Sequence, residues 1–244
     1  MPKKIYDEEA TQALLNACNY YYNDPNLEFV KACIAGGADV NADRSAPFMY
    51  ACVYGRDDLL RVLLDAGSKV NVRAGQPLVR ACGAGYLEIV RMLAEAGANL
   101  YAQKGEALPA AMQSGNRELV DFLLAQGMDP ALHPFVTLDY AATVGDLALA
   151  KKMLEPEEVR TRAAGSWALD NSANRACVYG NLELLKLFHE VNPGITGNLN
   201  AAVKHGQWEI VRYIVEELGE TVPPESLEYA REYPELYDYL KNKC

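Results

Sequence analysis

The residue types that could perform catalysis are scattered along this chain. The three histidines, His133, His189 and His205, occupy different positions of the repeat described below. A metal site needs ligands that converge, and this spacing predicts no such cluster. The sequence also has no G-x-S-x-G, G-x-G-x-x-G, phosphate-loop or H-E-x-x-H motif. We therefore expect a protein that is not an enzyme and that holds no cofactor and no metal.

The remaining chemistry is recognition by aromatic and cationic side chains. Tyr and Arg are enriched at binding hot spots, because they give a large contact area for little loss of entropy. They recur in this chain at two kinds of position, just before a small Ala-Cys or Ala-Ala pair and just before a recurring glycine. The candidate partner-binding residues at these positions are Tyr50, Tyr54, Arg80, Gln113, Tyr140, Arg175, Tyr179 and Lys204. Alternatively, the tyrosines pack against the neighbouring repeat and Arg80 and Arg175 merely solvate the surface.

These positions belong to a repeat. Glycines at 55, 85, 115 and 145 are separated by steps of 30 residues. Each glycine follows a short Ala-rich segment and precedes a segment with apolar residues at i, i+1, i+4 and i+5, as at 59, 60, 63 and 64. This spacing places the apolar residues on one face of a helix. A fixed step of this size indicates a solenoid of helix–turn–helix units, in which each unit contacts its neighbours.

We predict one continuous domain over residues 1–244, with unequal repeats. The predicted boundaries are 8–43, 44–73, 74–103, 104–130, 131–159, 160–194 and 195–222, followed by a C-terminal cap at 223–244. The first repeat has a longer loop at 19–25, and the steps between glycines change after Gly145 to 35 and then 26. End repeats are expected to deviate, because one of their faces has no neighbour.

Three segments resemble the ankyrin repeat. They are Gly36-Gly37-Ala38-Asp39-Val40-Asn41-Ala42, Ala46-Pro47-Phe48-Met49-Tyr50-Ala51-Cys52 and Gly85-Tyr86-Leu87-Glu88-Ile89-Val90. The resemblance implies an all-α stack of about eight helix–turn–helix units, with atypical N- and C-terminal caps. It also implies that a protein partner binds in the concave groove. The ankyrin period is 33 residues, so the shorter step here predicts shortened fingers between the repeats.

The longest connection, residues 155–170, contains one of the two tryptophans. One interpretation is that Trp167 folds back as a plug over a poorly fitting repeat, since Trp is usually buried. The other is a presented finger in which Arg160, Arg162 and Trp167 contact a partner, since loops often carry function. The sequence leaves both interpretations open.

Composition limits the partners and the location. The net charge of −10 argues against binding to nucleic acid or to an anionic membrane, which both need a basic surface. No apolar run approaches the roughly 20 residues of a spanning helix, and from the first residues we expect no secretory signal. Cys18, Cys52, Cys82 and Cys177 share one small, buried position. We expect reduced cysteines and an intracellular, cytoplasmic monomer, in its own cell or in a host cell.

The first functional hypothesis is a non-catalytic module that binds a protein partner in its concave groove. The second is an inhibitor or effector that blocks a host or target enzyme through the acidic surface or through the 155–170 loop.

Overall fold

The computed structural model describes residues 6–18 and 26–243 of the chain, and in these ranges the only regular structure is helical. The longer loop predicted at 19–25 lies outside the described residues. The helices form two compact units, unit 1 (Met1–Leu132) and unit 2 (His133–Cys244). The prediction of one continuous domain over 1–244 stays a prediction.

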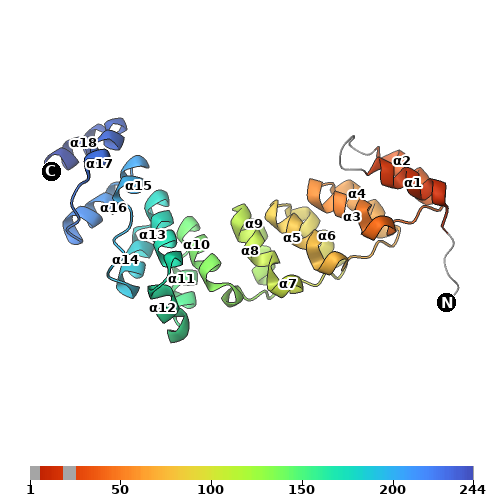
Figure 1. The fold of residues 1–244 in the computed structure, drawn as a ribbon, viewed down its shortest axis with the longest axis horizontal. Helices are drawn as coiled ribbons and strands as arrows, with labels where there is room; N and C mark the ends of the chain where they lie inside the picture. The colour runs from red at the N-terminus through yellow and green to blue at the C-terminus, as the bar shows by residue number, and fades with distance from the viewer. Residues whose placement is uncertain (1–5, 19–25, 244) are drawn as a thin grey trace. The chain divides into compact units, whose positions relative to one another are not determined.

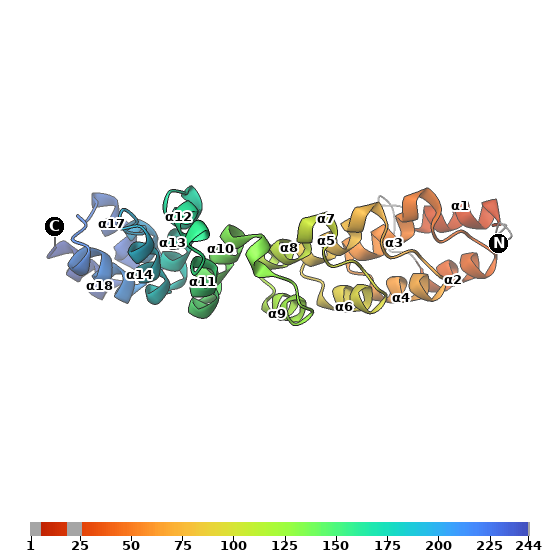
Figure 2. The same ribbon diagram turned by 90° about the horizontal axis from the view of Figure 1, so that it is seen from below.

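The described residues of unit 1 form four helix pairs. The pairs are α1 (Glu8–Ala17) with α2 (Leu27–Ala35), α3 (Ala42–Tyr54) with α4 (Asp57–Asp65), α5 (Gln76–Gly83) with α6 (Leu87–Glu95), and α8 (Ala107–Ser114) with α9 (Arg117–Ala125). Short elements connect them: η1 (Arg73–Gly75), α7 (Ala102–Gly105) and η2 (Pro130–Leu132). Helices α1, α3 and α5 lie side by side in one layer, and α2, α4 and α6 form the other (Figure 2).

Unit 2 contains four further pairs. They are α10 (Pro134–Val144) with α11 (Leu147–Leu154), α13 (Trp167–Tyr179) with α14 (Leu182–Val191), α15 (Leu199–Lys204) with α16 (Trp208–Arg212), and α17 (Pro224–Tyr229) with α18 (Pro234–Lys241). A π-helical turn, η3 (Tyr213–Glu217), continues α16, and η4 (Ala230–Glu232) joins α17 to α18 (Figure 1). The described residues thus confirm the predicted eight pairs.

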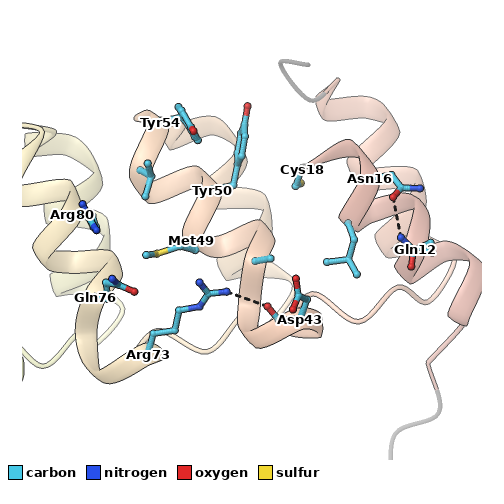
Figure 3. A pocket seen from close by; sticks show the side chains of 13 residues that line it. Gln12, Asn16, Cys18, Asp43, Met49, Tyr50, Tyr54, Arg73, Gln76 and Arg80 are labelled. Carbon is cyan, nitrogen blue, oxygen red and sulfur yellow. Dashed lines mark hydrogen bonds between the residues drawn. The ribbon is translucent and has the colours of Figure 1, made fainter. Parts of the chain in front are cut away.

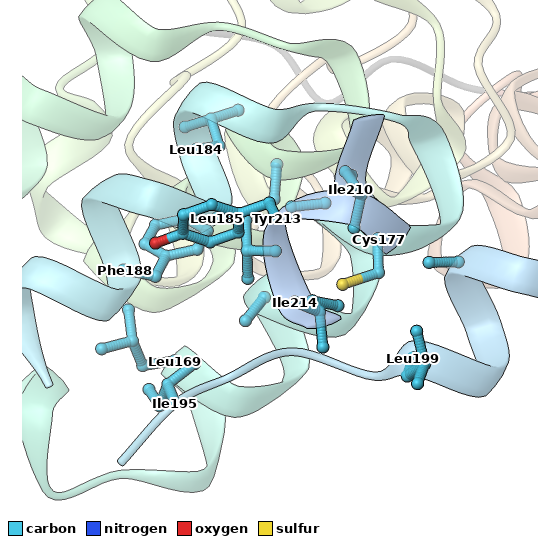
Figure 4. Close-up of a cluster of buried hydrophobic side chains, with 14 of the residues drawn as sticks. Leu169, Cys177, Leu184, Leu185, Phe188, Ile195, Leu199, Ile210, Tyr213 and Ile214 are labelled. Carbon is cyan, nitrogen blue, oxygen red and sulfur yellow. The ribbon is translucent and has the colours of Figure 1, made fainter. Parts of the chain in front are cut away.

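The second helix of each repeat buries the predicted face. On α4, Leu59, Leu60 and Leu63 are fully buried, whereas Asp58 and Arg61 on the opposite face are exposed. The same pattern gives α6 its buried Ile89 and Leu93. In unit 2, side chains from all four pairs form a continuous apolar cluster, which includes Leu185, Tyr213 and Ile214 (Figure 4).

The cysteine position is confirmed as small and buried. Cys18, Cys52, Cys82 and Cys177 are free thiols buried between helices. Burial raises the pKa of Cys52 and of Cys82 to about 12, because desolvation disfavours the thiolate. These thiols therefore act as small apolar groups in the core.

Several turn glycines lie close to a side chain of the next repeat. Gly55 has a left-handed φ of 69°, and a Cβ there would lie 3.0 Å from Cζ of the Tyr86 ring. In the next repeat, Asn116 Nδ2 donates a 2.9 Å hydrogen bond to the carbonyl of Gly85. In unit 2, Asn181 Nδ2 donates to the carbonyl of Ala142 at 2.7 Å. In both cases, the residue that follows a turn glycine is hydrogen-bonded to the backbone at or near the turn of the preceding repeat.

A second series of contacts joins the repeats of unit 1 through the segments that follow their second helices. Asn41 accepts from the backbone N–H of Lys69 at 2.8 Å, and Asn71 accepts from that of Asn99 at 2.7 Å. Asn71 Nδ2 also donates to the carbonyl of Gly97 at 3.0 Å. Each asparagine therefore satisfies backbone groups that follow the second helix of the next repeat.

The predicted short fingers are present as left-handed turns. Residues 43–45, 73–75 and 103–105 all have positive φ, and only Gly75 and Gly105 among them are glycines. A non-glycine residue in this conformation costs about 1–2 kcal/mol. Contacts between turns hold them in place. Arg73 Nε donates to the carbonyl of Arg44 at 2.9 Å, and Gln103 Nε2 donates to that of Ala74 at 3.2 Å.

The connection at 155–170 is helical, which corrects the expectation of a loop. Helix α12 (Glu157–Ala164) packs against α11, α13 and α14, and α13 begins at Trp167. The side chain of Trp167 is 79% exposed, so the interpretation as a plug is wrong. Ala163 is buried in its place, because α12 inserts a small residue into the apolar cluster of unit 2.

We predict that Leu93→Ala lowers the free energy of unfolding by about 2–5 kcal/mol. Leu93 is only 1% exposed, so its truncation leaves a cavity between neighbouring repeats. Chemical denaturation followed by circular dichroism measures the effect. Leu132→Ala is the matched control, since Leu132 is 49% exposed. If both variants lose the same stability, the repeat alignment is wrong.

We further predict that Gly55→Ala destabilises the protein more than Gly67→Ala. Both glycines have positive φ, so alanine costs about 1–2 kcal/mol at each position. A Cβ at Gly67 meets nothing within 4 Å, whereas one at Gly55 pushes against the Tyr86 ring. Denaturant unfolding of the two variants compares them directly. Equal losses would show that contact with the turn glycine does not set the packing of the repeats.

Candidate partner-binding groove

The first helices of three successive repeats in unit 1 enclose a groove of about 760 Å³. We call it the groove. Its side chains come from α1, α3 and α5 and from the turns that precede α3 and α5 (Figure 3). The lining residues are Gln12, Leu15, Asn16, Cys18, Asp43, Ala46, Met49, Tyr50, Val53, Tyr54, Arg73, Gln76 and Arg80.

Three of the predicted binding residues meet in this groove. Tyr50 and Tyr54 are one helical turn apart on α3, and their ring centroids lie 4.6 Å apart with the planes tilted by 39°. Tyr54 is 39% exposed, so part of its side chain is accessible in the groove. Burial raises the pKa of Tyr50, so its phenol is neutral and can donate and accept hydrogen bonds. Arg80 enters from α5 (Figure 3).

The cations of the groove differ in how they are held. Arg80 is exposed and has no hydrogen bond or ion pair in the described part of the chain. Arg73 reaches from its own turn to the preceding one, where its guanidinium donates to the carbonyls of Arg44 at 2.9 Å and Asp43 at 3.2 Å. Carbonyls satisfy the N–H groups of Arg73 but leave its positive charge in place.

The floor of the groove combines apolar and polar side chains. Met49 and Val53 supply apolar surface next to the two tyrosines. On α1, Gln12 Nε2 donates to Asn16 Oδ1 at 2.9 Å. The amide of Gln76 on α5 lies on the other side of this apolar surface (Figure 3). Amides on both sides suit an extended peptide, because the peptide backbone presents donors and acceptors on its two edges.

Several groove residues were not predicted from the sequence. Met49, Arg73 and Gln76 do not share the recurring positions used to select Tyr50 and Arg80. Arg73 lies in the short left-handed connection before α5, and Gln76 is the first residue of that helix. The shortened finger indicates that this connection lies near the first helices. The sequence does not indicate that the connection has a left-handed backbone conformation.

The other candidate in unit 1 lies outside the groove. Gln113 is exposed near the end of α8 and is absent from the groove lining. A role for Gln113 in binding stays a prediction.

The candidates at equivalent positions in unit 2 are partly used within the fold. Tyr140 is only 6% exposed, so its expected exposure is wrong; α10 packs along α13 and covers it. Arg175 Nε lies 2.7 Å from Asp139 Oδ2, which joins α13 to α10. Burial raises the pKa of Asp139, although Arg175 and a hydrogen bond from Asn171 oppose this shift. The charge of Arg175 is therefore already balanced by an internal carboxylate.

The remaining candidates of unit 2 stand at its surface. Tyr179 is exposed at the end of α13, and Lys204 Nζ lies 6.0 Å from the ring centroid of Tyr229. Arg162 on α12 lies over the Phe135 ring at 5.5 Å. Trp167 is the most exposed large apolar residue described. Whether any of these contacts a partner stays a prediction.

The described residues also bear on metal binding and on membranes. Among these residues, no group of three or more His, Cys, Asp or Glu side chains is arranged to hold a metal ion. None of their helices combines the length and the apolar character required to cross a membrane.

Comparison with known proteins rests on the fold. No family model matches the sequence, and no curated protein matches it either. A solved structure that does match is the ankyrin repeat domain of human ASB11, with a TM-score of 0.52 and 22% identity over 89% of this chain and 100% of that chain. Another is the ankyrin repeat domain of Bcl-3, a unique member of the IkappaB protein family, with a TM-score of 0.48 and 21% identity over 76% of this chain and 86% of that chain. Together with the helix pairs and glycine turns, the likeness to the ASB11 domain shows that this chain has the ankyrin repeat fold, in a divergent form with short left-handed turns between its repeats.

Proposed function

We propose that this protein is a non-catalytic interaction module that binds an extended peptide segment of a partner protein in the groove of unit 1. One observation carries the proposal: Tyr50, Tyr54 and Arg80, selected from the repeat alone, come from two different repeats and line the same groove. Tyr and Arg are the residue types that most often dominate binding energy.

The groove suits a peptide better than a small metabolite. It is open along three repeats, and its polar groups are spread over α1, α3 and α5 instead of converging on one point. A site for a small molecule usually encloses most of its ligand and aims a few polar groups at it. An apolar side chain of the peptide would lie over Met49 and Val53, next to the two tyrosine rings.

We predict that Tyr50→Ala/Tyr54→Ala weakens peptide binding by about a hundredfold or more. Truncating a hot-spot residue costs about 2 kcal/mol or more, and the two rings lie in contact. Phage-displayed random linear peptides selected on the full-length wild-type chain provide the probes. Fluorescence anisotropy with a recovered peptide then gives the dissociation constants, and circular dichroism verifies that the variant keeps its helices.

Tyr229→Ala is the matched control, because Tyr229 is a 42% exposed tyrosine on α17 in unit 2. It should leave the affinity unchanged. If the double variant binds as tightly as the wild type, or if the control loses as much, the groove is not the binding site.

The proposed setting is intracellular. The five described free cysteines support it, since reduced thiols are typical of intracellular proteins. A cytoplasmic location and a monomeric state stay predictions.

The alternative function, an inhibitor or effector acting through 155–170, has one observation in its favour. Trp167 is 79% exposed at the start of α13, where a Trp side chain can serve as a hot-spot anchor. Because the segment is helical, this anchor would be rigid, so little entropy would be lost on binding.

On this alternative, Trp167→Ala abolishes capture of the target enzyme and leaves the free energy of unfolding within about 0.5 kcal/mol of wild type, as for an exposed side chain. Affinity capture from the source cell, with identification of the captured enzyme and an assay of its activity, measures the effect. Capture that persists in Trp167→Ala and is lost in Tyr50→Ala/Tyr54→Ala would reject the alternative in favour of the groove.

A further inference from the structure

A second cavity adjoins the groove on the side of the left-handed turns. It has a volume of about 620 Å³ and we call it the basic recess. Its lining residues are Asn41, Arg44, Ser45, Lys69, Val72, Arg73 and Gln76. Arg73 and Gln76 also line the groove, so the recess continues it. A single extended chain can therefore occupy both.

The recess concentrates positive charge in an acidic molecule. Arg44, Lys69 and Arg73 are three cations among its seven lining residues, and none of the seven is a carboxylate. The chain as a whole carries a net charge of −10. A long polyanion such as a nucleic acid would be repelled by the rest of the surface, whereas a short acidic segment would meet the three cations alone.

These cations are not neutralised from within. Arg44 and Lys69 are exposed and have no ion pair with any described residue. The guanidinium of Arg73 donates to the carbonyls of Arg44 and Asp43, which fixes its position and leaves its charge. By contrast, Arg56 in the same unit lies 2.8 Å from an Asp58 carboxylate oxygen, and Arg175 in unit 2 is paired with Asp139. The positive charge of the recess is therefore available to a ligand.

The backbone of the recess is strained. Asp43, Arg44 and Ser45 at one turn and Arg73 and Ala74 at the next are non-glycine residues with φ between 46° and 61°. Each costs about 1–2 kcal/mol in this conformation. The strain presents Arg44 and Arg73 from successive repeats to one cavity. Backbone strain of this kind concentrates at binding sites, where it fixes the position of contact groups.

We infer that the basic recess binds an acidic stretch of the partner peptide, whose adjacent apolar or aromatic residue occupies the tyrosine side of the groove. This inference rests on the proposed function. The three cations that line this one cavity can pair with successive carboxylates along an extended peptide. The recess thereby selects the charge of the ligand and fixes the direction in which the peptide lies.

The test uses the full chain and a phage-displayed library of random linear peptides. Peptides recovered on the wild type should be enriched in Asp and Glu relative to the unselected library, next to an aromatic or large aliphatic residue. Peptides recovered on Arg44→Glu/Lys69→Glu should lose this enrichment. The matched control is Arg61→Glu/Arg117→Glu, which changes the same charge on exposed positions of the second helices α4 and α9. The control should recover acidic peptides as the wild type does.

A recovered acidic peptide, labelled with fluorescein, then gives affinities by anisotropy. Reversing two contacting charges places like charges together, so we expect the dissociation constant to rise about tenfold or more for Arg44→Glu/Lys69→Glu and to stay unchanged for the control. Added salt should weaken binding to the wild type, where it screens an attraction, and should strengthen the residual binding to the reversed variant, where it screens a repulsion. Circular dichroism verifies that both double variants remain helical.

The outcomes separate this inference from the proposed function. If the recovered peptides depend on Tyr50 and Tyr54 but are not acidic, or if they bind the reversed variant as tightly as the wild type, the basic recess is not a binding site and the groove remains one. If no recovered peptide depends on the two tyrosines, the proposed function fails, and the inference fails with it.

Discussion

The structure depends on one contact that is made again at successive junctions between repeats. The residue that follows a turn glycine reaches back to the turn of the preceding repeat. Asn116 illustrates both halves of this role: its Oδ1 accepts from the backbone N–H of Leu119 at the start of α9, and its Nδ2 donates to the carbonyl of Gly85. One side chain thus starts a helix and fixes that helix to its neighbour. Since repeats in a solenoid contact only adjacent repeats, each such junction transmits its alignment to the next.

Most of the fold could be predicted because it follows from local pattern. The spacing of glycines and the paired apolar residues, such as Leu59 and Leu60, indicate two helices and a turn without any knowledge of distant contacts. The buried position shared by Cys52 and Cys82 follows from the same comparison between repeats. The segment at 155–170 was misjudged because it matches no other repeat. Its helical state depends on packing against α11, α13 and α14, which the sequence of the segment alone does not encode.

The candidate site was predictable only in part, for a related reason. Repeat position identified Tyr50, Tyr54 and Arg80 correctly as residues that share one surface. The same position misled at Tyr140, which is buried, and it did not reveal that Arg175 is paired with Asp139. Arg44, Lys69 and Arg73 escaped notice because their place in one cavity depends on left-handed turns, which non-glycine residues rarely adopt. Equivalent positions in a repeat are therefore equivalent in backbone, whereas their exposure depends on how closely the adjacent helices approach.

Helix α12 has a consequence for how this architecture tolerates change. The contact from Asn181 to Ala142 spans 39 residues, whereas the one from Asn116 to Gly85 spans 31, yet both join one turn to the next. The extra residues are accommodated as a helix whose end is held by Asn192, which donates to the carbonyl of Ala164 at 2.7 Å. Closing a longer connection costs little additional entropy, because that cost grows only with the logarithm of length. The junction between α11 and α13 is thus a natural place to graft a foreign segment, whether evolution or an engineer supplies it.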